Sequence, residues 1–189
     1  GTTGNDLTFS GNGVIGNLAM VGGGPGELTF SGDINLAGSQ IVGNGGLGRI
    51  NFTGNNTGGY SQIREGIEVG IGHDNALGTI SLIRVVFDPV FYAMNGPRTI
   101  SQNFELAVTD FIVDGPEDLT VTGNIVNDTG FSGGLTKDGT GTLTLAGNNT
   151  YTQDTNVNAG SLIVNGSITS SNVTVANGAS LGGSGTISQ

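Results

Sequence analysis

The sequence predicts an all-β fold, a right-handed single-stranded parallel β-helix of roughly nine coils with about 19–24 residues in each coil. Three observations lead to this prediction. A short apolar-polar-apolar segment closed by glycine recurs along the chain, the 37 glycines are spread over the whole sequence, and no segment keeps the period of an α-helix.

The recurring segment sets the length of one coil. Its six copies are Leu7-Thr8-Phe9-Ser10-Gly11, Leu28-Thr29-Phe30-Ser31-Gly32, Ile50-Asn51-Phe52-Thr53-Gly54, Leu119-Thr120-Val121-Thr122-Gly123, Leu143-Thr144-Leu145-Ala146-Gly147 and Leu162-Ile163-Val164-Asn165-Gly166. Their first residues differ by 21 (28−7), 22 (50−28), 69 (119−50), 24 (143−119) and 19 (162−143). Because 69 is about three periods of 23, we interpret all six copies as one strand repeated in successive coils.

Each copy alternates apolar and polar residues, which places the apolar side chains on the inner face of a strand. Strands stacked about 4.8 Å apart would bring equal residues into one column, and we expect Phe9, Phe30 and Phe52 to form such a column. The same spacing gives a rod about 40 Å long. Glycines such as Gly147 and Gly166 are expected at corners with positive φ, where the chain bends between sheets.

We expect a single β-helix segment over residues 1–189 with three regions. Residues 1–79 form degenerate coils, residues 80–118 form irregular coils or an insertion, and residues 119–189 carry the most regular repeat. Bulky residues gather in the middle region, namely Val85, Val86, Phe87, Val90, Phe91, Tyr92, Met94 and Phe104. They could fill coils with a wider core, belong to a loop packed on the side of the helix, or form a binding patch.

The composition excludes several classes of function. A formal net charge of −10, with only 5 lysines and arginines, would repel nucleic acids and anionic lipids, so no nucleic-acid partner is expected. No apolar run approaches the roughly 20 residues of a membrane-spanning helix, so no membrane insertion by this segment is expected. The absence of cysteine excludes disulfides and thiol catalysis. Because the chain begins at Gly1 without methionine, we interpret it as a fragment of a longer chain.

The segment from Leu135 to Asn165, LTKDGTGTLTLAGNNTYTQDTNVNAGSLIVN, resembles the passenger-associated transport repeat of autotransporters, also called the autotransporter-associated β-strand repeat. The residues that fit its pattern are Lys137, Gly139, Gly141, Leu143, Leu145, Gly147, Asn149, Tyr151, Thr155, Gly160, Leu162 and Val164. Gln153 and Asp154 stand where the family usually has two glycines, which puts the geometry of that turn in question. Residues 50–70 and 173–187 look like a degenerate copy and a continuation of such repeats.

The resemblance implies a β-helical passenger that is secreted or displayed at the surface of a Gram-negative bacterium. In that family the repeat is thought to help the passenger fold outside the cell, with each coil serving as the template for the next. An open sheet end has unpaired backbone groups, so the physical chemistry of strands agrees with this idea.

Short motifs that could carry chemistry have simpler structural explanations. His73 and Asp74 are neighbours, and neighbouring residues of a strand point to opposite faces, unlike a catalytic pair. Residues 178–182 match G-x-S-x-G, and residues 11–16 and 43–48 match G-x-G-x-x-G, but no helix pattern follows any of them.

The densest acidic group comprises Asp110, Asp114, Glu117 and Asp118. Its spacing fits neither an EF-hand nor a calcium-binding β-roll, and a solvated turn is the simpler interpretation. Asn55, Asn127 and Asn172 lie in Asn-x-Ser/Thr sequons, which leave surface glycosylation open. We expect no catalytic, cofactor-binding or metal-binding residue, and no cofactor.

These observations predict a non-catalytic stalk or fibre segment of an autotransporter-like surface protein, assisting passenger folding during export. An adhesin that binds glycans, matrix or neighbouring cells is the first alternative. A polysaccharide-degrading β-helix enzyme is the second, and the few scattered cations argue against it. Expected partners are adjacent coils or domains of the parent protein, further copies in end-to-end or lateral association, and a glycan or cell-surface ligand.

Overall fold

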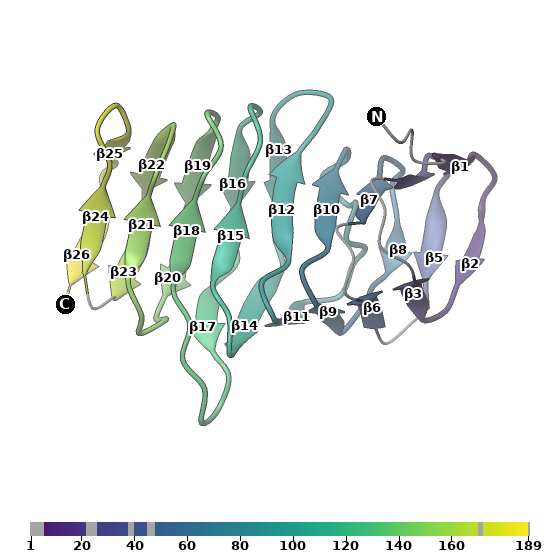
Figure 1. Ribbon diagram of the computed structural model, residues 1–189, viewed down its shortest axis with the longest axis horizontal. Coiled ribbons are helices and arrows are strands. Elements are labelled where there is room, and N and C mark those ends of the chain that lie inside the picture. The colour runs from purple at the N-terminus through teal and green to yellow at the C-terminus, as the bar shows by residue number, and fades with distance from the viewer. Residues whose placement is uncertain (1–5, 22–25, 38–39, 45–47, 170–171, 189) are drawn as a thin grey trace.

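A computed structural model describes residues 6–21, 26–37, 40–44, 48–169 and 172–188. These residues contain strands and turns but no helix, and every paired strand is parallel to its neighbour. The strands lie side by side along the long axis, with the two termini at opposite ends (Figure 1). The predicted fold, an all-β parallel β-helix, is confirmed.

One sheet runs the length of the molecule. It has nine strands, in the order β1 (Leu7–Phe9), β4 (Glu27–Phe30), β7 (Arg49–Phe52), β10 (Glu68–Ile71), β12 (Val90–Ala93), β15 (Phe111–Val113), β18 (Leu135–Lys137), β21 (Thr155–Val157) and β24 (Val173–Val175). Because its neighbours are one coil apart in sequence, nine strands correspond to eight complete turns (9 − 1), close to the predicted coil number.

Shorter sheets form the other sides of the coils. A six-stranded sheet contains β17 (Ile125–Asn127), β14 (Asn103–Ala107), β11 (Leu82–Val86), β9 (Gln62–Arg64), β6 (Gln40–Asn44) and β3 (Leu18–Val21). A five-stranded sheet contains β13 (Arg98–Ile100), β16 (Leu119–Val121), β19 (Thr142–Leu145), β22 (Ser161–Val164) and β25 (Ser180–Gly182). Two three-stranded sheets contain β2 (Gly13–Ile15), β5 (Ile34–Leu36) and β8 (Thr57–Gly58), and β20 (Asn148–Asn149), β23 (Ser167–Thr169) and β26 (Thr186–Ser188).

The predicted phenylalanine column is confirmed. Phe9 pairs in register with Phe30, and Phe30 with Phe52. The ring centroids are 5.4 Å apart for the first pair and 5.6 Å for the second, and both pairs are stacked. Each such contact adds dispersion and quadrupole attraction to the burial of apolar area.

The interpretation of all six sequence copies as one strand is wrong. Ile50 lies in the nine-stranded sheet and pairs with Val69, which pairs with Phe91. Leu119 instead lies in the five-stranded sheet, where it pairs with Leu143. A coil has strands on several sides, and alternation looks the same on every side. A spacing near a multiple of the period therefore does not show which side a strand occupies.

Of the eight bulky residues of the middle region, four are buried, three are half-buried and one is exposed: Val85, Val86, Phe91 and Phe104, then Val90, Tyr92 and Met94, and finally Phe87. Strands β11, β12, β14 and β15 pair on both sides with strands of neighbouring coils, and β13 is the edge strand of the five-stranded sheet. Phe91, Phe104 and Phe111 are fully buried, with ring centroids between 4.8 and 5.6 Å apart. Three aromatic rings therefore pack together in the core of this part of the helix. The division into residues 1–79, 80–118 and 119–189 stays a prediction.

The expected role of Gly147 and Gly166 is also wrong. Neither residue is among those with positive φ. A Cβ atom at Gly147 would overlap the carbonyl oxygen of Gly123, and one at Gly166 would overlap that of Gly147. Glycine is needed here because the backbones of successive coils approach closely at this corner, rather than because the chain turns left-handed.

Candidate functional site

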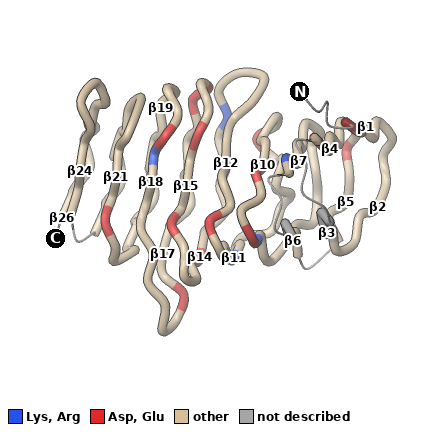
Figure 2. The backbone as a smooth tube through the Cα atoms, viewed as in Figure 1, with Lys and Arg blue, Asp and Glu red and all other residues tan. Residues whose placement is uncertain are grey.

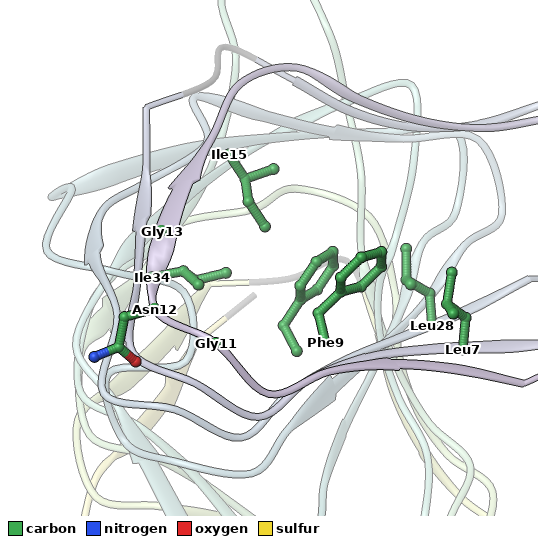
Figure 3. Close-up of a pocket in the computed structure, with 9 residues that line it drawn as sticks. Leu7, Phe9, Gly11, Asn12, Gly13, Ile15, Leu28 and Ile34 are labelled. Carbon is green, nitrogen blue, oxygen red and sulfur yellow. The ribbon is translucent and has the colours of Figure 1, made fainter.

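The N-terminal end of the β-helix core is open. A cavity of about 600 Å³ lies there, lined by Leu7, Phe9, Gly11, Asn12, Gly13, Ile15, Leu28, Phe30 and Ile34. Leu7, Phe9 and Ile15 point toward the interior of the coil (Figure 3). Phe9 is 48% exposed, whereas Phe30 and Phe52, one and two coils further in, are 5% and 0% exposed. Among the described residues, no further coil covers these core side chains.

The last coil at the C-terminal end is exposed in the same way. Val175, Leu181 and Ile187 are each more than a third exposed. Each continues a column of the core, because they pair in register with Val157, Leu162 and Ile168, which are buried. Both ends of the segment thus present apolar columns and unpaired strand edges.

Polar side chains tie successive coils together along the outer corners. The carboxamide oxygen of Asn12 accepts a hydrogen bond from the backbone N–H of Asp33, and the carboxylate of Asp33 accepts one from Asn55. Asn103 and Asn124 repeat this pattern with the N–H groups of Asn124 and Asn148, at 2.8 Å each. These contacts satisfy backbone groups that the bends leave without a strand partner.

Two buried asparagines do the same from inside the coil. The Asn56 side chain accepts a hydrogen bond from the N–H of Ile34 and donates one to the carbonyl of Ala76. Ile34 and Ala76 lie in the coils on either side of Asn56. Asn149 accepts from Ile125 and donates to the carbonyls of Gly147 and Ser167. Each side chain joins three coils, and its burial is balanced by this full set of partners.

Lys137 lies in the core, which the sequence analysis missed. It is 1% exposed and stands in a column between Val113 and Val157. Its Nζ donates to the carbonyl oxygen of Gly139. Burial lowers the pKa of Lys137, and the carboxylates of Asp114, Asp138 and Asp118 oppose this effect. The alternation of Leu135, Thr136 and Lys137 was the signal, since residues two apart share a face.

The residues of the rejected catalytic motifs serve local structure. His73 Nδ1 accepts a hydrogen bond from the backbone N–H of Asn75 at 3.0 Å, and the carboxylate of Asp74 accepts one from Thr99 at 3.0 Å. Ser180 lies on an exposed strand and its hydroxyl contacts that of Ser161 at 2.7 Å. Neither arrangement has the geometry of a nucleophile and its base.

The glycine-rich motifs fall at the N-terminal end. Residues 11–16 span the bend into β2 and the strand itself, and no helix follows them. Residues 43–48 are described only in part, because residues 45–47 lie outside the described ranges.

The acidic group is spread along the corners. Asp110 accepts from the N–H of Gly134, Asp114 from that of Gly115, and Asp118 from that of Thr142, at 2.6–2.7 Å. Within the described ranges, no three histidine, cysteine or acidic side chains lie close enough together to hold a metal ion. These carboxylates hold turns in place.

The sequon asparagines also contact neighbouring coils. Asn55 accepts from the side chain of Asn75, and Asn127 donates to Thr152 at 2.7 Å. Asn172 donates to Asp154 at 3.0 Å. Their side chains stabilise the coil stack, and glycosylation at these positions stays untested.

The fold and these contacts define a class of protein, a parallel β-solenoid whose recognisable features are stacking columns and corner ladders. The family profile of the Passenger-associated-transport-repeat matches residues 135–164. Over 61 residues the chain is 52% and 49% identical to two proteins named extracellular serine protease from Serratia marcescens. The match covers 32% of this chain and 6% of each relative. No solved structure matches the chain.

These comparisons confirm the predicted resemblance to an autotransporter passenger that carries this repeat. They also agree with the predicted location, secreted or at the surface of a Gram-negative bacterium. The segment shared with the relatives is a repeat segment of a much longer protein. Among the described residues, no helix has the length and apolar character needed to span a membrane.

Proposed function

We propose that this chain is a non-catalytic structural segment of an exported passenger, in which each folded coil is the template for the next. The observation that carries the proposal is one unbroken column in register through all nine strands of the long sheet: Leu7, Leu28, Ile50, Val69, Phe91, Val113, Lys137, Val157 and Val175. A coil completes its hydrogen bonds and its core only against the coils beside it, so coils should be added one at a time to an existing end.

Residues 135–164 are the best candidate for the first coils to fold. Their backbones approach closely at Gly139 and Gly147, and Asn149 joins three coils by hydrogen bonds. Most of these contacts link neighbouring coils, so the loops that must close are short and the entropic cost is low.

Refolding of the whole chain from urea, followed by pulsed hydrogen exchange and mass spectrometry, tests this order. We expect amides of residues 135–164 to become protected before those of residues 27–71. A Gly147→Ala variant should slow that early protection, whereas Gly11→Ala, which meets no atom within 4 Å, should leave it unchanged. Earlier protection of the N-terminal coils would contradict the proposal.

The non-catalytic part of the proposal rests on the carboxylates. Asp110, Asp114 and Asp118 each accept a backbone N–H, which suits a structural role better than acid-base catalysis. Release of reducing ends from polygalacturonate by the purified chain would show this assignment to be wrong.

End-to-end association of copies is part of the same proposal, because the two exposed ends are suited to it. Sedimentation velocity over a range of concentrations tests this association.

An adhesin remains the second candidate, because exposed apolar residues lie on one corner of the middle coils. Their geometry supports a more definite statement about the partner.

A further inference from the structure

Non-glycine residues adopt left-handed backbone at one corner of three successive coils. Glu65, Phe87 and Val108 have φ of 68°, 59° and 60°. Each directly follows a strand of the six-stranded sheet, at the bend toward the nine-stranded sheet, and the residues before them are paired in register as Arg64, Val86 and Ala107. The three residues therefore occupy the same corner at successive levels.

This conformation is costly for two of these residues. The left-handed region is disfavoured for any side chain with a Cβ, and a β-branched or bulky residue there is a clear outlier. At other turns this chain places glycine at positive φ, for example at Gly115, Gly130 and Gly160. The corner thus keeps phenylalanine and valine where glycine would fit without strain.

Packing does not explain this choice. Phe87 is 48% exposed and Val108 is 55% exposed, so neither side chain gains the full benefit of burial. In the next coil, Phe131 lies in the loop after β17 and is 42% exposed. The Arg84 guanidinium lies 5.5 Å from the centre of its ring and pairs with Asp128 of the same loop at 2.5 Å. Phe87 and Val108 form what we call the corner ridge, and Phe131 lies beyond it.

The surroundings of the corner ridge are acidic. Glu65, Asp88, Asp110 and Asp128 lie at or next to this corner in successive coils. In Figure 2, acidic segments recur along the lower side of the tube, where the six-stranded sheet passes into the nine-stranded sheet. Two cations lie at the same corner, Arg84, which is paired with Asp128, and Arg64, which directly precedes Glu65, so the four carboxylates outnumber them. A partner would therefore meet apolar side chains within a negative field.

We propose that the corner ridge binds a polypeptide segment that carries both apolar and basic side chains. Apolar residues of the partner would cover Phe87 and Val108, and lysine or arginine would lie against the flanking carboxylates. A second copy of this chain does not fit, because it has a net charge of −10 and only 5 lysines and arginines. This surface is independent of the templating of coils.

Fluorescence anisotropy with a labelled peptide of alternating lysine and leucine tests the proposal on the whole chain. We expect saturable binding that weakens with added salt, and at least tenfold weaker binding of peptides that alternate lysine with serine or glutamate with leucine. The decisive variant is Phe87→Gly combined with Val108→Gly. It should weaken binding at least tenfold while the midpoint of thermal unfolding stays the same or rises, because glycine adopts this φ without strain.

Two further variants distinguish peptide binding at the corner ridge from non-specific binding to exposed apolar side chains. Leu181→Ala removes a comparably exposed apolar residue at the far end and should leave binding unchanged. Glu65→Gln should weaken binding about threefold and reduce its dependence on salt. A fall in the unfolding midpoint of the double glycine variant would show that the two side chains are structural. The proposal would be overturned by peptide binding that survives this variant, or by the absence of any peptide binding to the parent chain. It would also be overturned if the parent chain bound a glycan instead and the variant lost that binding.

Discussion

The N-terminal and C-terminal halves of the β-helix stack their coils in the same way but fill their cores with different side chains. From Phe30 to Phe111 aromatic rings, stacked or tilted against one another, share the core with aliphatic residues such as Ile63 and Val85. After Val113 the buried side chains are mainly aliphatic, such as Leu143 and Leu162, with Lys137, Asn149 and the ring of Tyr151 among them. Close glycine corners occur in both halves, because a Cβ at Gly54 would overlap the Gly32 carbonyl just as one at Gly147 would overlap that of Gly123.

The repeat profile matches residues 135–164, within the half whose core is mainly aliphatic. Where aromatic rings fill the core, strands of different sheets can supply the ring. Phe91 and Phe104 are an example, since they lie in different sheets and their rings fill neighbouring space. Where backbone lies against backbone, no substitute for glycine fits. Glycine is therefore fixed by sterics at Gly54 in the first half as well as at Gly139, Gly141 and Gly147 in the second.

The largest expected loss of stability follows from removing one aromatic ring from the core of the middle coils. Phe111→Ala would leave a cavity next to Phe91 and Phe104, whose ring centroids lie 5.0 Å and 4.8 Å away. We expect the free energy of unfolding to fall by about 3–5 kcal/mol, measured by urea denaturation followed by circular dichroism. Leu143→Ala in the mainly aliphatic core should cost less, about 2–3 kcal/mol. A larger loss at Leu143 than at Phe111 would break the comparison between the two cores.

The next effect compares a crowded glycine with an open one. A Cβ at Gly147 would overlap the Gly123 carbonyl, whereas a Cβ at Gly11 would meet nothing within 4 Å. Gly147→Ala should therefore destabilise the chain by about 3 kcal/mol, and Gly11→Ala should stay within about 0.5 kcal/mol of the parent. Thermal unfolding of both variants checks this. Equal effects would mean that glycine is needed at these corners for another reason.

The same contrast shows what the sequence could predict. The column of Phe9, Phe30 and Phe52 followed from copies spaced by one coil within one sheet. The sheet that contains Leu119 did not follow, because alternation and period are the same on every side of a coil. Contacts at corners were equally hidden, since they depend on how close two backbones come.

The candidate surfaces were less predictable than the fold. The exposed N-terminal end follows from any solenoid that begins with an apolar strand. The burial of Lys137 could have been inferred from its place two residues after Leu135, although its charge argued against it. The positive φ at Phe87 and Val108 had no local signal, because glycine and asparagine, the usual markers of that conformation, are absent at both positions.

A moderate effect is expected at the buried asparagine of the repeat. Asn149→Ala would leave the N–H of Ile125 and the carbonyl of Ser167 without their side-chain partner inside the core. The expected loss is about 2 kcal/mol, whereas Asn148→Ala on the exposed outer ladder should cost less than about 1 kcal/mol. Urea denaturation of the two neighbouring variants measures the difference. A larger cost at Asn148 would assign the main stabilising ladder to the outside of the coil.

The smallest expected effect is the pH dependence that Lys137 adds to stability. Burial lowers the pKa of Lys137 in the folded chain, so above that pKa the unfolded chain binds more protons than the folded one. The free energy of unfolding should therefore rise with pH between the lowered pKa and the ordinary value of 10.5, by at most about 1.4 kcal/mol per pH unit.

Lys137→Met removes this titration and keeps a side chain of similar length in the column between Val113 and Val157. Its stability should equal or exceed that of the parent at pH 8 and should lack the rise toward pH 9.5, because an apolar side chain has no charge to desolvate. Urea denaturation over this range stays below the region where tyrosine matters, since burial raises the pKa of Tyr60 to about 12 and its contribution changes only above about pH 10. Parallel curves of unfolding free energy against pH for the two proteins would show that the Lys137 ammonium reaches solvent. The core of the repeat would then tolerate a charge that its geometry does not predict.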